Sequence, residues 1–202
     1  MGTRRNRAET SEQNRRDVLD AAHRVFLQKG YHGASLDAIA LDAGFSKGVV
    51  YSQFGSKDDL FLALLAERID ARRRNSAQRA DDVTGPEGFV DVARGAIGVT
   101  ADSLAWQTVM LEFRAHAARH PATLAHYTEL HERAIAGTAE ILAGIFERAG
   151  ATPPLPPRIL GVIFLSVGTG LAAELLTDPD LDARAISEYI ADGLVARAAI
   201  RT

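Results

Sequence analysis

Apolar residues recur at helical spacing near the start of the chain. The stripe consists of Val18, Ala21, Ala22, Val25 and Phe26. Residues at these spacings share one face of a helix, so the pattern predicts an amphipathic first helix. Gly30 is predicted to close it, because glycine readily adopts the positive φ found at helix C-termini. Thr10 and Gln13 predict a capping box at its start.

Residues 35–54 predict two further short helices joined by a tight turn. The apolar face of the first consists of Leu36, Ile39, Ala40 and Ala43. Gly44 is predicted to end this helix, and the Ser46 hydroxyl to cap the next one. Three helices of this size make a small core, whose expected members are Val25, Phe26, Leu36, Ile39, Val50 and Phe54.

The second short helix has two unlike faces. Val50 and Phe54 lie on its apolar face, and the polar face carries Lys47, Gly48, Tyr51 and Ser52. A short helix that follows a tight turn, with one buried side and one side bearing Lys, Tyr and Ser, is typical of a DNA recognition helix.

The rest of the chain predicts an all-α fold, in which Pro and Gly separate the helices. The expected spans are 56–79, 86–100, 104–119, 121–149, 157–176 and 181–199. The sequence contains neither a sustained alternation of apolar and polar residues nor an Asn-Gly or Asp-Gly hairpin turn, so we expect no strand. The uncharged run 159–173 is interpreted as a helix buried on most sides, because it is short for a membrane span and contains three glycines.

Charge is distributed unevenly along the chain. The formal net charge of the 202 residues is −3, yet residues 1–57 hold nine Lys/Arg against six Asp/Glu, a net of +3. A basic N-terminal segment (residues 1–57, the head) on an acidic remainder (residues 58–202, the body) is expected where only the head contacts phosphate. The chain has no cysteine, which excludes disulfides and thiolate catalysis and fits a reducing cytoplasm.

The sequence offers no catalytic motif. It lacks a Walker-type loop, GxSxG, SxxK and HExxH, so we expect neither an enzyme nor a cofactor. His116 and His120 are four residues apart, and Glu112 is a conceivable third metal ligand. A His just before a helix-ending proline is equally explained by the helix dipole, and metal sites need three or four ligands. We therefore predict no metal site.

Residues 25–61 read VFLQKGYHGASLDAIALDAGFSKGVVYSQFGSKDDLF. This segment resembles the N-terminal pattern of the TetR/AcrR family of bacterial transcriptional regulators. The resemblance implies a helix-turn-helix DNA-binding domain with a basic N-terminal arm at 1–55, and a helical effector-binding and dimerisation domain at 56–202. It also implies a homodimer whose last two helices form a four-helix interface. Many members carry an aromatic residue and a His where this chain has Ser52 and Gln53.

Residues of the N-terminal arm and of the segment 35–57 are predicted to contact DNA. The expected residues are Arg4, Arg5, Ser35, Ser46, Lys47, Gly48, Val49, Tyr51, Ser52, Gln53 and Lys57. Lys47 fits either a guanine edge or a phosphate, and Lys57 fits a phosphate held with the N-terminal amides of the fourth helix. The arm, expected to be disordered, either enters a minor groove or only improves solubility.

Two further sets are predicted in the body. The expected effector contacts are Trp106, Met110, Phe113, Tyr127 and His131, which equally fit an ordinary helical core. The expected dimer interface is Ile163, Val167, Leu171, Ile186, Ile190 and Leu194. The uncharged run is apolar nearly all round, which the surface of a single chain would leave exposed to water.

Together these patterns and the family resemblance predict a cytoplasmic, homodimeric transcriptional repressor that is not attached to a membrane. Its expected partners are a palindromic double-stranded operator and a small-molecule effector that releases it from the DNA. A transcriptional activator or dual regulator is an alternative within the same class. A helical ligand-binding or interaction protein whose head has lost DNA binding is an alternative from a different class.

Overall fold

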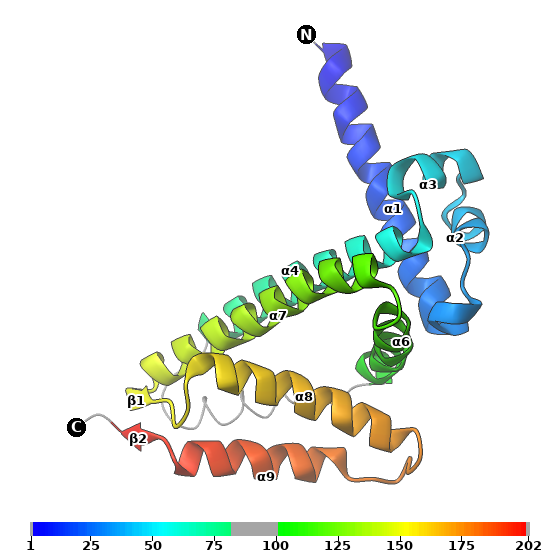
Figure 1. The fold of residues 1–202 in the computed structure, drawn as a ribbon. Coiled ribbons are helices and arrows are strands. Elements are labelled where there is room, and N and C mark those ends of the chain that lie inside the picture. The colour runs from blue at the N-terminus through cyan, green and yellow to red at the C-terminus, as the bar shows by residue number, and fades with distance from the viewer. Residues whose placement is uncertain (1, 82–100, 201–202) are drawn as a thin grey trace. The chain divides into compact units, whose positions relative to one another are not determined.

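The computed structural model describes the backbone of residues 2–81 and 101–200, and the side chains of 10–75, 104–194 and 196–198. The all-α class is confirmed (Figure 1). The helices are α1 (Gly2–Gly33), α2 (Leu36–Ala43), α3 (Lys47–Phe54), α4 (Lys57–Asp81), α6 (Ala101–Ala117), α7 (Pro121–Arg148), α8 (Pro157–Leu175) and α9 (Ala183–Ala196). The helix expected at 86–100 lies outside the described residues.

The chain divides into two compact units. The first comprises Met1–Arg68 and Thr108–Tyr127, and the second comprises Ile69–Gln107 and Thr128–Thr202. Helices α4, α6 and α7 each contribute residues to both units. The domain boundary expected after residue 55 therefore stays a prediction.

The first unit is built around the apolar stripe of α1. All six core residues expected from the sequence are buried: Val25, Phe26, Leu36, Ile39, Val50 and Phe54. Aromatic rings extend this core toward α6, because Phe61 packs edge-on against Phe26 at 5.1 Å and stacks on Phe113 at 4.2 Å between centroids. Such ring pairs add to the stabilisation from buried area.

Helix α1 differs from expectation at both ends. It begins at Gly2, so Thr10 lies inside the helix and the capping box expected there is wrong. Residues 3–29 contain neither Gly nor Pro and are rich in Arg, Gln, Glu and Ala, which favour helix. Gly30 does interrupt the helix, with φ 69° and ψ 175°, and one helical turn follows it.

Serines stand at the starts of the next helices, and a glycine ends α2. The Ser35 hydroxyl accepts a hydrogen bond from Ala38 N and caps α2, which ends at Gly44 with φ 73°. Ser46 holds the N-cap position of α3, but its hydroxyl makes no capping bond, so that expectation is wrong. The Ser56 hydroxyl accepts from Asp59 N at 3.1 Å at the start of α4.

The second unit has its core between the last three helices. Leu142, Ile145 and Phe146 of α7 are buried with Leu160 and Phe164 of α8. Gly161 permits a close approach of α8 to α7, since an added Cβ would lie 2.7 Å from the carbonyl oxygen of Ile135. Helices α8 and α9 lie side by side (Figure 1).

A short strand pair in the second unit was not predicted. Strand β1 (Ala151–Thr152) pairs antiparallel with β2 (Ala199–Ile200), and Ala151 lies opposite Ile200. Two-residue strands are too short to give a readable alternation, so the absence of a strand signal was misleading here.

Helix α8 is less enclosed than the sequence suggested. It is long and apolar enough to span a membrane, and only 28% of its most apolar stretch is buried. An added Cβ at Gly168 or Gly170 would meet nothing within 4 Å. The interpretation of α8 as buried on most sides is therefore wrong for the single chain.

Candidate nucleic-acid interface

Helix α3 presents the two faces that its sequence predicts. Val50 and Phe54 are buried. The exposed residues of the helix itself are Lys47, Gly48, Tyr51 and Ser52, and Ser46 just before it is exposed as well. Tyr51 is 49% exposed although its ring is large and apolar. The polar face is therefore accessible to a partner, and its contact with DNA stays a prediction.

Lys47 is already paired within the head. Its ammonium donates a hydrogen bond to the carboxylate of Asp37 in the first turn of α2. That bond, followed by the negative charge of Asp37, raises the pKa of Lys47 above its ordinary value. Sequence reasoning selected Lys47 and missed Asp37, which precedes it by ten residues and reaches it only through the turn.

The serines near α3 are engaged in local hydrogen bonds. The Ser35 hydroxyl caps α2, and Ser52 Oγ donates to Val49 O at 2.9 Å within α3. Both side chains remain exposed. A hydroxyl has one donor and two acceptor lone pairs, so Ser35 keeps its own O–H available for a phosphate while it caps the helix.

Lys57 occupies a place that the sequence did not predict. Its ammonium donates to the carbonyl oxygens of Tyr31 at 2.8 Å, Ala34 at 3.1 Å and His32 at 3.5 Å. It also lies 4.5 Å from the centre of the Tyr31 ring. Burial lowers the pKa of Lys57, while the charges of Asp58 and Glu112 oppose that change. All three ammonium hydrogens therefore have acceptors at the end of α1.

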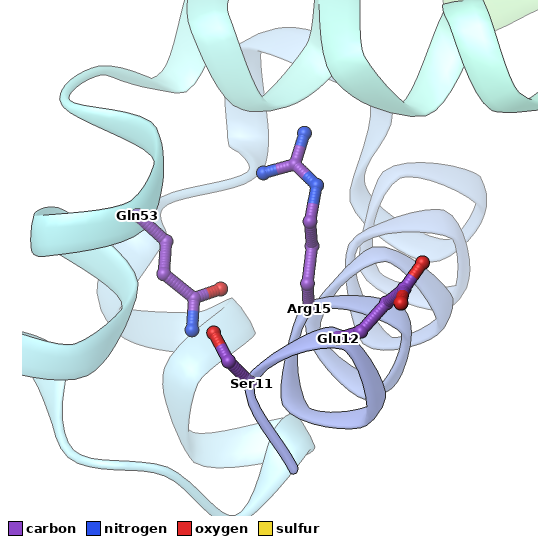
Figure 2. Close-up of a pocket in the computed structure, with 4 residues that line it drawn as sticks. All are labelled: Ser11, Glu12, Arg15 and Gln53. Carbon is purple, nitrogen blue, oxygen red and sulfur yellow. The ribbon is translucent and has the colours of Figure 1, made fainter. Parts of the chain in front are cut away.

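Gln53 faces α1 and not the exposed side of α3. Figure 2 shows its amide directed toward Ser11, with Arg15 beside them, and these residues line an open pocket of about 470 Å³ together with Glu12. Gln53 Oε1 is buried and, among the described residues, accepts no hydrogen bond. The Arg15 guanidinium lies 4.6 Å from the Phe54 ring centre. The position of Gln53, three residues after buried Val50, was a signal for this orientation.

The basic arm is helical in its backbone. Residues 2–9 continue α1, so the expectation of a disordered arm is wrong for the same reason that α1 begins early. The side chains of Arg4 and Arg5 lie outside the described residues.

Asp58, which the sequence analysis did not select, joins four segments of the first unit. Tyr31 Oη donates to its Oδ1, Thr123 Oγ1 donates to Oδ2 at 2.7 Å, and His116 Nε2 lies 3.0 Å from Oδ2. Burial alone would raise the pKa of Asp58, but these hydrogen bonds and the charge of His116 hold it below its usual range. Burial, followed by the bond to Asp58, raises the pKa of Tyr31.

The pair considered for a metal has other partners. The rings of His116 and His120 stack with centroids 4.0 Å apart, and His120 Nδ1 lies 2.8 Å from the carbonyl oxygen of His116. Glu112 Oε2 accepts from His32 N at 3.2 Å. No group of three candidate metal ligands occurs among the described residues.

The expected effector contacts fall in both units. Met110, Phe113 and Tyr127 are buried in the first unit, where Tyr127 Oη accepts from Arg114 Nε at 2.6 Å. Trp106 is buried and His131 half-buried in the second unit. Phe113 belongs to the aromatic core, as the alternative interpretation allowed.

Most residues expected at the dimer interface pack inside their own unit. Leu171 is 7% exposed within the core. The partly buried residues packed against that core include Val167, Ile186, Ile190 and Leu194, and Ile163 is half-buried. Among the described side chains of these two helices, the exposed large apolar residues are Ile159 on α8, 46% exposed, and Tyr189 on α9, 82% exposed.

Comparison with known proteins agrees with this architecture. The family model described as bacterial regulatory proteins, tetR family, matches residues 18–64. The HTH-type transcriptional repressor AcnR of Corynebacterium glutamicum is 26% identical over 165 residues, covering 81% of this chain and 82% of AcnR.

Two solved structures have the same fold at low identity. A putative TetR-family regulator from Rhodococcus sp. is 22% identical with a TM-score of 0.73, over 91% of this chain and 99% of that one. FadR from Bacillus subtilis, solved in complex with stearoyl-CoA, is 16% identical with a TM-score of 0.61, over 90% of this chain and 97% of FadR.

Proposed function

The chain belongs to the TetR family of bacterial regulatory proteins, and we propose that it is a homodimeric repressor released from its operator by a small molecule. The observation that carries the proposal is the exposed polar face of α3, set on a buried apolar face behind the turn at Gly44. A helix held in this way can enter the major groove and present its first residues to base edges. A regulator of this kind works in the cytoplasm and needs no catalytic site.

Tyr51 is the first test of DNA binding. Its hydroxyl lies on the exposed face and can donate to a phosphate, a contact that positions the protein on any sequence. Tyr51→Ala is expected to weaken binding to operator and random DNA alike, by about tenfold or more. Fluorescence anisotropy with DNA from upstream of the protein's own gene measures both affinities.

Tyr51→Phe is the matched control, because it keeps the ring and removes only the hydroxyl. A loss of DNA affinity in both variants would assign the effect to the hydrogen bond from the Tyr51 hydroxyl to a phosphate. Unchanged affinity in both would contradict the role of α3 and favour a helical interaction protein without DNA binding.

For the dimer interface we propose the outer faces of α8 and α9. Gly168 and Gly170 leave open space beside α8, where a partner helix can approach closely, and Tyr189 supplies a large exposed ring. Five of the six residues expected from the sequence then pack on the core of their own unit and support this interface from behind. Ile163, which is half-buried, stays a candidate for direct contact. A dimer is required if two half-sites about 34–36 Å apart are to be bound together.

The effector is proposed to be largely apolar. The contacts expected from the sequence stay predictions, and those among them that are buried are Trp106, Met110, Phe113 and Tyr127. FadR was solved with stearoyl-CoA, so a long-chain acyl-CoA is the first probe. Release requires that the ligand bind the DNA-free state better, and by reciprocity operator DNA must weaken ligand binding by the same factor, typically about 5–150-fold.

Calorimetric titration of stearoyl-CoA with and without operator measures this coupling. Weaker ligand binding in the presence of operator supports release of the protein by this ligand, and tighter binding would contradict release. Equal affinity would mean that this ligand does not control DNA binding.

A further inference from the structure

Several cations among the described side chains of the head have partners inside the protein. Arg24 donates two hydrogen bonds to Asp42 at 3.0 and 2.7 Å, and Arg16 lies 3.5 Å from Glu12. Lys57 is held by the carbonyl oxygens at the end of α1. Arg16, Arg24 and Lys57 must therefore exchange a partner within the protein before they can bind a phosphate.

Lys47 differs from these other cations in its position. It is the first residue of α3 and the sole Lys or Arg on that helix. Its partner Asp37 comes from the first turn of α2, across the turn between the helices. The side chains are 66% and 47% exposed, so the ion pair faces water and whatever docks on α3. An exposed pair stabilises the fold little, so the Lys47 ammonium can exchange Asp37 for a suitable acceptor on a docked partner.

We propose, on the basis of the DNA-binding function above, that Asp37 is a specificity-determining residue that withholds Lys47 from non-operator DNA. A free ammonium at the start of α3 would attach to any phosphate and strengthen binding to every sequence equally. While Asp37 holds it, a sequence must supply a better acceptor before Lys47 contributes to binding. A guanine edge does so with two acceptor atoms, O6 and N7.

The carboxylate also penalises wrong sequences directly. Once Lys47 has turned to the DNA, Asp37 is left close to the phosphates without its cation. A cytosine N4 or an adenine N6 amino group can donate to it, whereas guanine and thymine offer no donor in the major groove and leave it unpaired. Specificity then arises partly from an unfavourable contact with wrong sites, which is a general way to separate partners of similar shape.

The decisive variant is Asp37→Asn in the full-length protein. Affinity is measured for the operator fragment and for random duplex DNA of equal length, over a range of salt concentrations. For random DNA we expect tighter binding and a steeper slope of log affinity against log salt, by about 0.9 for each head that gains a phosphate contact. The ratio of operator to random affinity is expected to fall.

Asp42→Asn is the matched control. It removes the same charge from the same helix, but its partner is Arg24 on α1. It is expected to leave the salt slope and the affinity ratio unchanged. In a Lys47→Gln background, Asp37→Asn is expected to lose its effect on random DNA, because the ammonium that it would release is absent. Asp37→Glu is expected to restore the affinity ratio.

Two results would overturn the proposal. Equal effects of Asp37→Asn and Asp42→Asn would reduce it to a general charge effect. Parallel loss of both affinities with a lower denaturation midpoint would make the pair a structural brace between α2 and α3. Failure of the DNA-binding function itself would be seen separately, as a wild-type protein that does not distinguish operator from random DNA.

Discussion

At the scale of single residues, Asp58 and Lys57 hold the end of α1 on the start of α4. Lys57 binds the last carbonyl oxygens of α1, and Asp58 accepts from Tyr31 in the same segment. The sequence predicted that Lys57 would bind a phosphate together with the N-terminal amides of the fourth helix. Its carbonyl partners lie more than twenty residues earlier, so they were not readable without the fold.

Asp58 gives the first unit a measurable acid sensitivity. Its pKa is below the ordinary value in the folded state, so its stabilisation is complete above about pH 4 and is lost as pH falls through the folded-state pKa. Asp58→Asn should lower the free energy of unfolding at pH 7 by about 1–3 kcal/mol, because it weakens bonds to a charged acceptor. The variant should also lose less stability than the wild type between pH 5 and pH 2.

Urea denaturation at fixed protein concentration measures both effects. Asp70→Asn is the control, because Asp70 forms an exposed pair with Arg133 at 2.8 Å that contributes little. If wild type and Asp58→Asn lost the same free energy of unfolding between pH 5 and pH 2, Asp58 would not be a source of the acid sensitivity.

At the scale of elements, helix ends were predictable where Gly or Pro mark them. Gly44 ends α2, Pro121 begins α7 and Pro157 begins α8, as the sequence indicated. The start of α1 was missed, because residues 3–9 contain neither Gly nor Pro to mark a boundary and the apolar stripe begins only at Val18. The exposed face of α3 followed from its periodicity, whereas the ion pair with Asp37 depends on the angle between two helices and not on any local pattern.

Gly161 sets the packing between α7 and α8. An added Cβ would lie 2.7 Å from the backbone carbonyl oxygen of Ile135, which cannot move away as a flexible side chain would. Gly161→Ala should therefore destabilise the second unit by about 1–3 kcal/mol despite the better helix propensity of alanine. Gly168→Ala, which meets nothing within 4 Å in the single chain, should be neutral or slightly stabilising. Thermal denaturation that ranks the two variants equally would contradict this packing.

At the scale of the whole molecule, we expect a second subunit to cover the partly exposed α8. Tyr189→Asp places a charge on the outer face of α9 without entering the core, because this side chain is 82% exposed. We expect a folded monomer that binds the operator weakly, since one head alone reaches a single half-site. Light scattering gives the mass, and circular dichroism checks the fold.

Leu171→Asp is the contrasting variant. Leu171 is buried in the core of its own unit, so a charge there should unfold the protein and not merely separate the subunits. A Tyr189→Asp protein that remains a dimer would move the interface away from the outer face of α9.

The β1–β2 pair also limits how the lengths of the last two helices can change by insertion or deletion. Paired residues 151–152 and 199–200 close a loop that contains the 19 residues of α8 and the 14 of α9. Four residues inserted into α8 alone would lengthen it by about 6 Å, more than the roughly 4.8 Å that separates paired strands. Related chains that keep this strand pair should therefore vary in length elsewhere, or change both helices together.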